Sequence, residues 1–413
     1  MTLIDTKMLR RPFLLACGLL FFLLATSALQ AQAQRNTSSS ALEIKPGARI
    51  LFLGSSLFEN EIAKGYLEFA LATRWPDREL TFRNLGWMGD NVFAEARSTF
   101  TTPPTPYQQL FQQIRSTNPD YVLLAYGSTE AQRGQAGVKH FVKGLETLID
   151  SIDAMGAQTI LISTVPVQSA GDAQLTEQLQ KNLKIYADAV SSVASRRKKR
   201  FVDFYTPLAS NMDGLFLDNG IHLNEAGYYS LAQTLESALG WSPRGAKVVI
   251  DASQSAASSA NAKILSSKDG GIVFTYKEPF LPLPVTSGGK YDESASVSVE
   301  VSGLKQGFYT LTENGRQLAT ASAADWASGV VLSHGLSQVQ AARISDYIAK
   351  KNGLFFQQYR PMNRTYILGF RAYEQGNHKQ GLQDLDFIIA WLEGHININR
   401  QPVVKTYELR PLK

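Results

Sequence analysis

The stretch Arg49-Ile50-Leu51-Phe52-Leu53-Gly54-Ser55-Ser56 decides the fold. Its short apolar run ends at a glycine, which is typical of a strand buried on both faces of a parallel sheet. Gly54 lets the chain turn sharply from such a strand into a helix. The segment therefore predicts the first strand of an α/β domain, with Ser56 at the start of the helix that follows.

Short apolar runs and helical spacing alternate along the next part of the chain. Further strands are expected over Leu80–Leu85, Tyr121–Tyr126, Thr159–Ile162 and Phe201–Phe204. Helices are expected over Asn60–Trp75, Tyr107–Thr117, Val138–Met155, Leu175–Ser195 and Asn224–Leu239. This alternation produces a parallel sheet with helices on both faces. We therefore predict an α/β fold with a five-stranded parallel sheet in a flavodoxin-like α/β/α sandwich.

The composition changes after Trp241, where Ser, Gly, Val and Thr become frequent in short alternating segments. Phe308–Thr312 and Gln317–Ala319 flank an Asn-Gly pair, which is a strong hairpin signal. A β-rich, sandwich-like module is therefore expected. Gln338–Lys351 and Leu382–Gly394 carry helical spacing and predict a helical C-terminal extension.

The N-terminus has the pattern of a secretory signal peptide. Basic residues (Lys7, Arg10, Arg11) precede an apolar stretch, which ends at the small-residue site Ala31-Gln32-Ala33. This order predicts cleavage after Ala33 and export to the periplasm or the extracellular space. The alternative is an uncleaved anchor, because the apolar run is about long enough to span a bilayer.

These boundaries give a complete expected domain organisation. It comprises a signal peptide (1–33), a flexible leader (34–46), the α/β domain (47–241), the β-rich module (246–335) and the helical C-terminal extension (336–413).

The composition excludes several classes of protein. The 413 residues are 44% hydrophobic and 19% charged, which is an ordinary globular balance and not that of a disordered or collagen-like chain. The single cysteine, Cys17, excludes a disulfide framework and a cysteine-based metal site. A net charge of +5 gives no strong case for nucleic-acid binding.

Polar residues follow the predicted strands at the edge where sites form in open α/β sheets. Ser55 and Ser56 follow the first strand, where helix N–H groups favour developing negative charge. Either serine can instead cap the helix, and this segment alone favours capping. His222 comes just before the last helix, with Asp218 and Asn219 upstream as groups that can orient its ring.

Two glycine-containing loops at the same edge can expose backbone N–H groups. Gly86-Trp87-Met88-Gly89-Asp90 follows the second strand, and Gly127-Ser128-Thr129-Glu130 follows the third. Such N–H groups can form part of an oxyanion hole. In isolation, each loop is equally consistent with an ordinary turn.

These four segments together, in this order, resemble the SGNH (GDSL-type) hydrolase family over roughly Ala48 to Leu239. The resemblance implies a fold shared with α/β/α esterases and lipases, many of which act on carbohydrate esters. The family's nucleophile position falls on Ser56 and its catalytic histidine on His222. Its oxyanion positions fall on Gly89 and Thr129, and the acid of its triad on Asn219.

Three residues depart from the family pattern. Ser55 replaces an aspartate, Thr129 replaces an asparagine that helps to hold the oxyanion, and Asn219 replaces the acid. Losing one oxyanion donor typically costs about 10²–10³ in rate, and losing the acid about 10⁴. Asp218 is one residue away and can serve if the loop turns it inward.

The C-terminal region resembles an extension found in SGNH-like proteins of planctomycete-type bacteria. Three polar residues in it, Arg360, Asn363 and Tyr366, can reach over the first domain or simply attach the tail to it. That subgroup often lacks a clear catalytic serine, so the resemblance leaves two hypotheses open.

The first hypothesis is an exported serine esterase that removes acyl groups, acetyl among them, from a small-molecule or polysaccharide ester. Ser56 is the nucleophile, His222 the base, and Asp218 or Asn219 the orienting group. The Ser56 and Gly89 N–H groups and Thr129 hold the oxyanion, and no metal or organic cofactor is required. The second hypothesis is a catalytically impaired protein that binds a glycan or a cell-envelope partner. Neither hypothesis involves nucleic acid or a membrane span after cleavage.

Overall fold

The computed structural model describes residues 41–97, 104–169, 171–289, 296–361, 373 and 378–412. Contacts divide the chain into Met1–Glu43 and Ile44–Lys413, and the second unit is the one described below. The predicted signal peptide, the leader up to Ser40, and the positions Asn363 and Tyr366 lie outside the described residues. Within the described ranges, no helix combines the length and apolarity that a membrane crossing requires.

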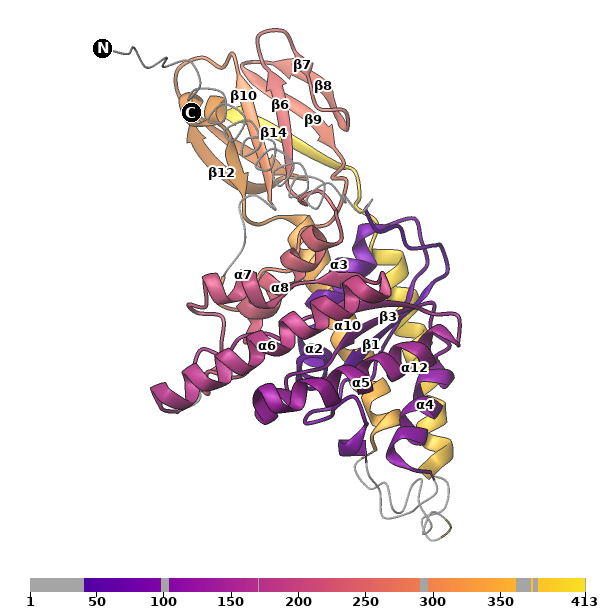
Figure 1. Cartoon of the computed structure of the whole chain (residues 1–413). Coiled ribbons are helices and arrows are strands. Elements are labelled where there is room, and N and C mark those ends of the chain that lie inside the picture. Colours follow the sequence, from indigo (N-terminus) through magenta and orange to yellow (C-terminus); the bar gives the residue numbers. More distant parts are fainter. Residues whose placement is uncertain are drawn as a thin grey trace, which may run out of the picture. The chain divides into compact units, whose positions relative to one another are not determined.

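The predicted parallel sheet is confirmed, with the strand order β2-β1-β3-β4-β5. Figure 1 shows two of its strands, β1 and β3, among the helices of the domain. Its strands are β1 (Arg49–Gly54), β2 (Thr81–Asn84), β3 (Tyr121–Ala125), β4 (Gln158–Ile162) and β5 (Arg200–Val202). The first strand lies between β2 and β3 and pairs with both in parallel. Because β3 and the part of β1 that follows the exposed Arg49 are buried, apolar runs, the sequence pattern identified both strands directly.

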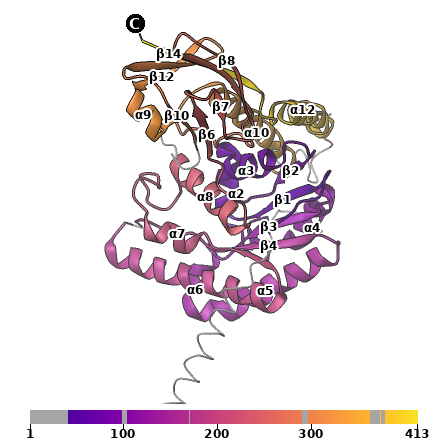
Figure 2. The ribbon, with the colours of Figure 1, turned by 90° about the horizontal axis from the view of Figure 1, so that it is seen from above.

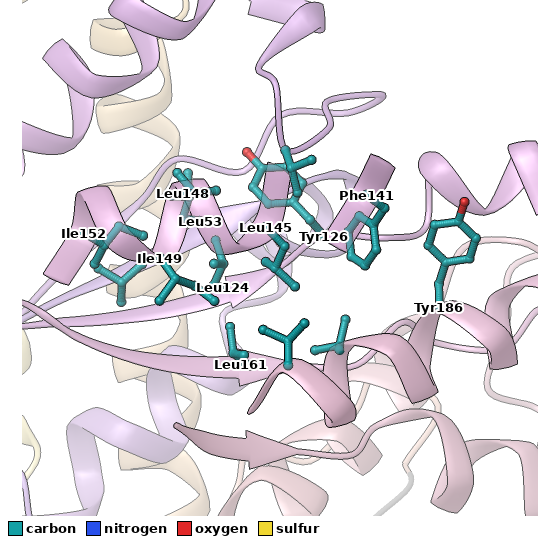
Figure 3. Close-up of a cluster of buried hydrophobic side chains, with 14 of the residues drawn as sticks. Leu53, Leu124, Tyr126, Phe141, Leu145, Leu148, Ile149, Ile152, Leu161 and Tyr186 are labelled. Carbon is teal, nitrogen blue, oxygen red and sulfur yellow. The ribbon is translucent and has the colours of Figure 1, made fainter. Parts of the chain in front are cut away.

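Helices cover both faces of this sheet (Figure 2). One face carries α4 (Pro106–Thr117), α5 (Gly134–Asp153) and α6 (Ala173–Arg197), and the other carries α2 (Ser56–Lys64), α3 (Tyr66–Arg74) and α8 (Glu225–Ala238). Helix α5 presents Leu145, Leu148 and Ile149 at helical spacing to the sheet residues Leu53 and Leu124 (Figure 3). Burial of this apolar stripe holds the first face together.

The single helix expected over Asn60–Trp75 is wrong, because the chain forms two helices there. Gly65 lies between α2 and α3 with φ +69°, a left-handed conformation that interrupts the helix. A side chain at this position would come within 2.9 Å of Ile348 in α10 (Leu336–Tyr359). The break therefore lets a distant helix approach, and periodicity alone carries no sign of that contact.

The β-rich module contains two packed sheets, as predicted. One has the order β13-β10-β6-β7 and the other β12-β11-β14-β9-β8. Buried side chains from both sheets, such as Ile250, Val301, Phe274 and Leu311, share one core. The strands are β6 (Ala246–Asp251), β7 (Ala256–Ala257), β8 (Ala262–Lys268), β9 (Gly271–Tyr276), β10 (Val297–Ser302), β11 (Phe308–Glu313), β12 (Arg316–Ser322), β13 (Val330–Leu332) and β14 (Lys405–Pro411). The expected Asn-Gly hairpin joins β11 to β12, with both turn residues at positive φ.

The C-terminal extension contains the expected helices as α10 and α12 (His378–Asn399). Its end adds a feature that the sequence pattern did not indicate. Strand β14 returns to the module and pairs antiparallel with both β9 and β11. The extension is therefore part of the second sheet as well as a neighbour of the first domain.

The basic run Arg196–Arg200 lies at the end of α6 and the start of β5. Arg196 bonds to Glu146 at 2.9 Å, Lys199 bonds to Asp153 at 2.6 Å, and Arg197 pairs with Asp150. The three acidic partners all belong to α5. Most of this charge is therefore balanced within the domain, as expected for the solvated end of a helix.

Gly86 offers a test of how tightly α2 packs on the loop after β2. A Cβ at Gly86 would lie 2.3 Å from the Glu59 backbone nitrogen, so either α2 or the loop must move. We expect Gly86→Ala to lower the free energy of unfolding by about 1–3 kcal/mol, as overpacking does. Thermal unfolding followed by circular dichroism measures this as a lower Tm.

Gly353 supplies the matched control, because it lies inside α10 and nothing comes within 4 Å of its added Cβ. Gly353→Ala should stabilise the protein by about 0.5–1 kcal/mol through helix propensity. Equal Tm values for Gly86→Ala and the unmodified protein would contradict the close packing of α2.

Candidate active site

A cavity of about 260 Å³ lies at the carboxyl edge of the parallel sheet. Ser56, Gly89, Thr129 and His222 all line it, and they come from four separate loops. Its deeper wall is apolar and is formed by Val165, Val167, Leu179, Leu183 and Leu223. The topology of the sheet thus brings together four of the residues singled out from the sequence.

Ser56 is the first residue of α2 and is half-buried. Ser55 occupies the N-cap position, but its side chain makes no capping hydrogen bond. The capping role that this segment alone favoured is therefore absent. Tyr228 of α8 fixes the first turn of α2, because its hydroxyl donates to the Leu57 carbonyl at 2.6 Å. The Ser56 hydroxyl has no hydrogen-bond partner among the described residues and remains open to the cavity.

The loop after β2 contains the cavity-lining residue Gly89, whose backbone N–H has no acceptor among the described residues. The Met88 N–H donates to Glu59 Oε2 at 2.5 Å, and the Asp90 N–H donates to the Trp87 carbonyl at 2.9 Å. Gly89 between them has φ +76°, and none of the described residues accepts from its N–H. The loop therefore offers the Gly89 N–H to a bound oxyanion.

A buried ion pair between Arg97 and Asp90 stabilises this loop. Arg97 Nε donates to Asp90 Oδ2 at 2.8 Å, and Arg97 also donates to the Leu85 carbonyl at 2.8 Å. The Tyr126 hydroxyl donates to the same Asp90 oxygen at 3.0 Å. Because both ionic side chains are fully buried, removal of either one would leave an uncompensated charge.

Glu130 joins the second and third loops. Its two carboxylate oxygens accept from the Val92 N–H at 2.9 Å and the Gly127 N–H at 3.0 Å. Burial raises the pKa of Glu130, although both backbone N–H groups oppose this effect. The sequence identified Glu130 only as a motif position, because its bond to Val92 joins residues 38 positions apart in the chain. Thr129, the residue before it, keeps its hydroxyl at the cavity wall.

Two residues were candidates to orient His222, and the structure places only one of them beside it. Asn219 Nδ2 lies 3.3 Å from His222 Nδ1. The Asp218 side chain is exposed and contacts no hydrogen-bond or ionic partner in the described part of the chain. The possibility that the loop turns Asp218 inward is therefore not what the structure shows.

The Asn219 contact determines where the ring proton of His222 lies. Asn219 Oδ1 accepts from the Ile221 and His222 N–H groups, both at 3.0 Å, so its Nδ2 must face the ring. An amide nitrogen can only donate, which makes His222 Nδ1 the acceptor and puts the ring proton on Nε2. A base that accepts a proton at Nε2 needs the opposite tautomer. Among the described residues, no hydrogen bond joins Ser56 to His222 in this resting arrangement.

A larger hollow of about 1060 Å³ lies between α4 and α5. Tyr107, Arg115 and Ser151 line this hollow, together with Pro104, the first described residue after Arg97. None of its lining residues belongs to the predicted site. In the part of the chain that the structure covers, no group of three or more His, Cys, Asp or Glu residues has the arrangement of a metal site. The smaller cavity is therefore the candidate active site.

Asn219→Asp tests the role of this contact. One carboxylate oxygen can keep the two backbone hydrogen bonds while the other accepts from Nδ1–H, which leaves Nε2 free to act as a base. We expect the rate of ester hydrolysis to rise by about 10²–10⁴-fold, the reverse of the loss seen when such an acid becomes an amide. Steady-state kinetics on p-nitrophenyl acetate measures the change.

Asp218→Asn is the matched control and should leave the rate within about twofold, because exposed groups without partners contribute little. A rate for Asn219→Asp that is equal to or below that of the unmodified protein would show that the amide does not limit the histidine.

Comparison with known families and structures agrees with this geometry. Residues 52–229 match the GDSL-like Lipase/Acylhydrolase family, and this range contains all of the site residues. No curated protein sequence matches the chain.

One of the matched solved structures shares the fold over most of the chain. The gut microbial diltiazem-metabolizing enzyme BT4096 superposes with a TM-score of 0.73 at 18% identity, over 90% of this chain and 99% of that one. The acetylxylan esterase Axe2 from Geobacillus stearothermophilus matches with a TM-score of 0.39 at 16% identity, over 49% of this chain and 98% of its own. The acetyl xylan esterase AlAXEase gives a TM-score of 0.38 at 18% identity, over 46% and 98%.

The motif order, the parallel sheet and the family match lead to one conclusion. Residues 52–229, which carry the whole candidate site, match the GDSL-like lipases and acylhydrolases, a family of enzymes that act on ester bonds.

Proposed function

We propose that this protein is an exported serine esterase that removes short acyl groups, acetyl among them, from a carbohydrate. The observation that carries the proposal is the shared cavity, in which Ser56, Gly89, Thr129 and His222 meet. The Ser56 hydroxyl is not used for capping, and the Gly89 N–H is unused by the fold. These are the groups that an acyl transfer to serine requires.

The reaction proceeds in two steps on these groups. Ser56 Oγ attacks the ester carbonyl, and the N–H groups of Ser56 and Gly89 bind the oxyanion with the Thr129 hydroxyl. His222 takes the hydroxyl proton at Nε2, which requires the ring to leave its resting tautomer and carry its own proton on Nδ1. His222 then returns the proton to the departing alcohol, which leaves an acyl group on Ser56. In the second step His222 deprotonates a water molecule and the resulting hydroxide attacks the acyl group. The acyl–Oγ bond then breaks, His222 returns the proton to Ser56 Oγ, and the carboxylic acid leaves.

The cavity favours a small acyl group. Its volume of about 260 Å³ is below the range of about 300–1,000 Å³ that accommodates drug-sized ligands. The apolar wall formed by Val165, Val167 and Leu183 suits a methyl or short alkyl chain. Asn60, Ser128 and Gln132 line the same cavity and can bond to sugar hydroxyls.

Export is supported by the N-terminal sequence pattern. Basic residues precede the apolar stretch, and the small-residue site ends at Ala33. Cleavage there would release the chain from Gln34 onward. An acetylated polysaccharide outside the cytoplasm is then an accessible substrate.

A second function is favoured by one observation, the amide of Asn219 beside His222. With the ring proton on Nε2, the site binds its ligand without turning it over efficiently. The protein would then recognise an acylated glycan through the same cavity. The two functions differ in whether Ser56 forms a covalent acyl intermediate.

Ser56→Ala separates these functions. We expect p-nitrophenyl acetate hydrolysis by the unmodified protein to exceed the buffer rate and to disappear in Ser56→Ala. Ser55→Ala is the control, because that hydroxyl makes no capping bond, and it should retain activity. Release of acetate from acetylated xylan would extend the result to a carbohydrate.

Equal rates for the unmodified protein and Ser56→Ala, both at the level of buffer, would contradict the esterase. Binding of an acetylated glycan by both proteins would then support the second function.

A further inference from the structure

The end of α10 contacts the loop that carries Gly89, although α10 lies outside the residues that match the family. The Tyr359 hydroxyl donates to the Gly86 carbonyl at 2.7 Å. The Arg360 guanidinium lies over the Trp87 ring, 4.3 Å from its centroid, within the range of a cation–π contact. Two consecutive residues of the C-terminal extension, Tyr359 and Arg360, thus contact two consecutive residues of this loop.

Glu59 of α2, the helix that begins at Ser56, contacts both Arg360 and this loop. Glu59 Oε2 accepts from Arg360 Nη1 at 2.6 Å and from the Met88 N–H at 2.5 Å. Glu59 follows Ser56 by three residues, so both lie on the first turns of α2. The Glu59 and Arg360 side chains are 19% and 30% exposed, which leaves their charge-assisted bonds partly shielded from water.

These contacts determine the direction of the Gly89 N–H. Nothing lies within 4 Å of a Cβ built at Gly89, so side-chain packing does not hold this residue. The hydrogen bonds of its two neighbours do so, because the Met88 and Asp90 N–H groups are both fixed. Loss of the Met88 bond would free the Trp87–Met88 peptide, which directly precedes the Met88–Gly89 peptide that carries the Gly89 N–H.

We propose that Arg360 is a positioning residue. It holds the Glu59 carboxylate on the Met88 N–H, and this keeps the Gly89 N–H directed at the ester oxyanion. The C-terminal extension thereby completes the active site of the first domain. The inference rests on the proposed esterase function and adds a residue to it.

The rest of α10 is attached independently of Arg360. Lys351 Nζ lies 2.8 Å from Glu68 Oε1 and donates to the Phe82 carbonyl at 3.1 Å. Asn352 Nδ2 donates to the other Glu68 oxygen at 2.8 Å. All three side chains are buried, so a change at Arg360 leaves the helix in place.

Arg360→Met tests the catalytic consequence by removing the charge and the hydrogen bond while keeping an apolar stem. We expect kcat to fall about 10–100-fold with KM within about twofold, a smaller loss than complete removal of an oxyanion donor. Arg360→Lys should recover most of the loss, because an ammonium can still pair with Glu59. If Arg360 had only a structural role, its loss would not lower kcat selectively, and Arg360→Lys would not restore kcat.

Glu393→Gln is the matched control. Glu393 of α12 pairs with Arg83 at 2.5 Å and attaches the same extension to β2, with comparable side-chain exposure. In the described part of the chain, no hydrogen bond or ion pair of Glu393 involves the loop at Gly86–Asp90. The kcat of Glu393→Gln should therefore equal that of the unmodified protein. A loss of kcat in Glu393→Gln as large as that in Arg360→Met would contradict a specific role for Arg360.

Hydrogen exchange measures the loop without relying on activity. Peptides that span Gly86–Asp90 should exchange faster in Arg360→Met and unchanged in Glu393→Gln. Unchanged exchange in Arg360→Met overturns the inference, as does faster exchange with an unaltered kcat. If no protein hydrolyses any ester but the loop responds as stated, the esterase function fails while the positioning by Arg360 stands.

Discussion

The close approach of α2 to the loop after β2 is the constraint on which the site depends. Gly86 has no room for a side chain, because the Glu59 and Phe58 backbone lies against it. The approach brings Ser56 and the Gly89 N–H to one cavity and places Glu59 under the Met88 N–H. If α2 and the loop after β2 were farther apart, Ser56 and the Gly89 N–H could not contact the same bound ester.

Asn219 is the residue of the proposed site that contacts His222 Nδ1. The cavity, the open serine hydroxyl and the backbone donor are all present, and the histidine has a partner at Nδ1. The partner is a donor, however, and it stabilises the tautomer that cannot accept a proton at Nε2. In the proposed esterase, the chain thus keeps the groups for binding an ester, while Asn219 stands at the position that orients the base.

The sequence predicted the elements that follow from the local pattern of apolar and turn residues. It did not predict the features that depend on contacts between distant parts of the chain. The five strands and the Asn-Gly hairpin were predictable, because buried runs and turn residues are local signals. The break at Gly65, the return of β14 to the second sheet, and the roles of Glu59, Glu130 and Arg360 were not, since their partners are distant in the chain. The ring tautomer required the hydrogen bonds of Asn219, which no motif records.

Covalent labelling with a fluorophosphonate tests the central claim most directly, because it requires a nucleophilic serine beside oxyanion donors. Intact-mass spectrometry followed by peptide mapping measures how many labels attach and where. The account predicts one label for each chain, on Ser56, and faster labelling of Asn219→Asp. A label on any other residue, or a folded protein in which neither form is labelled, would contradict it.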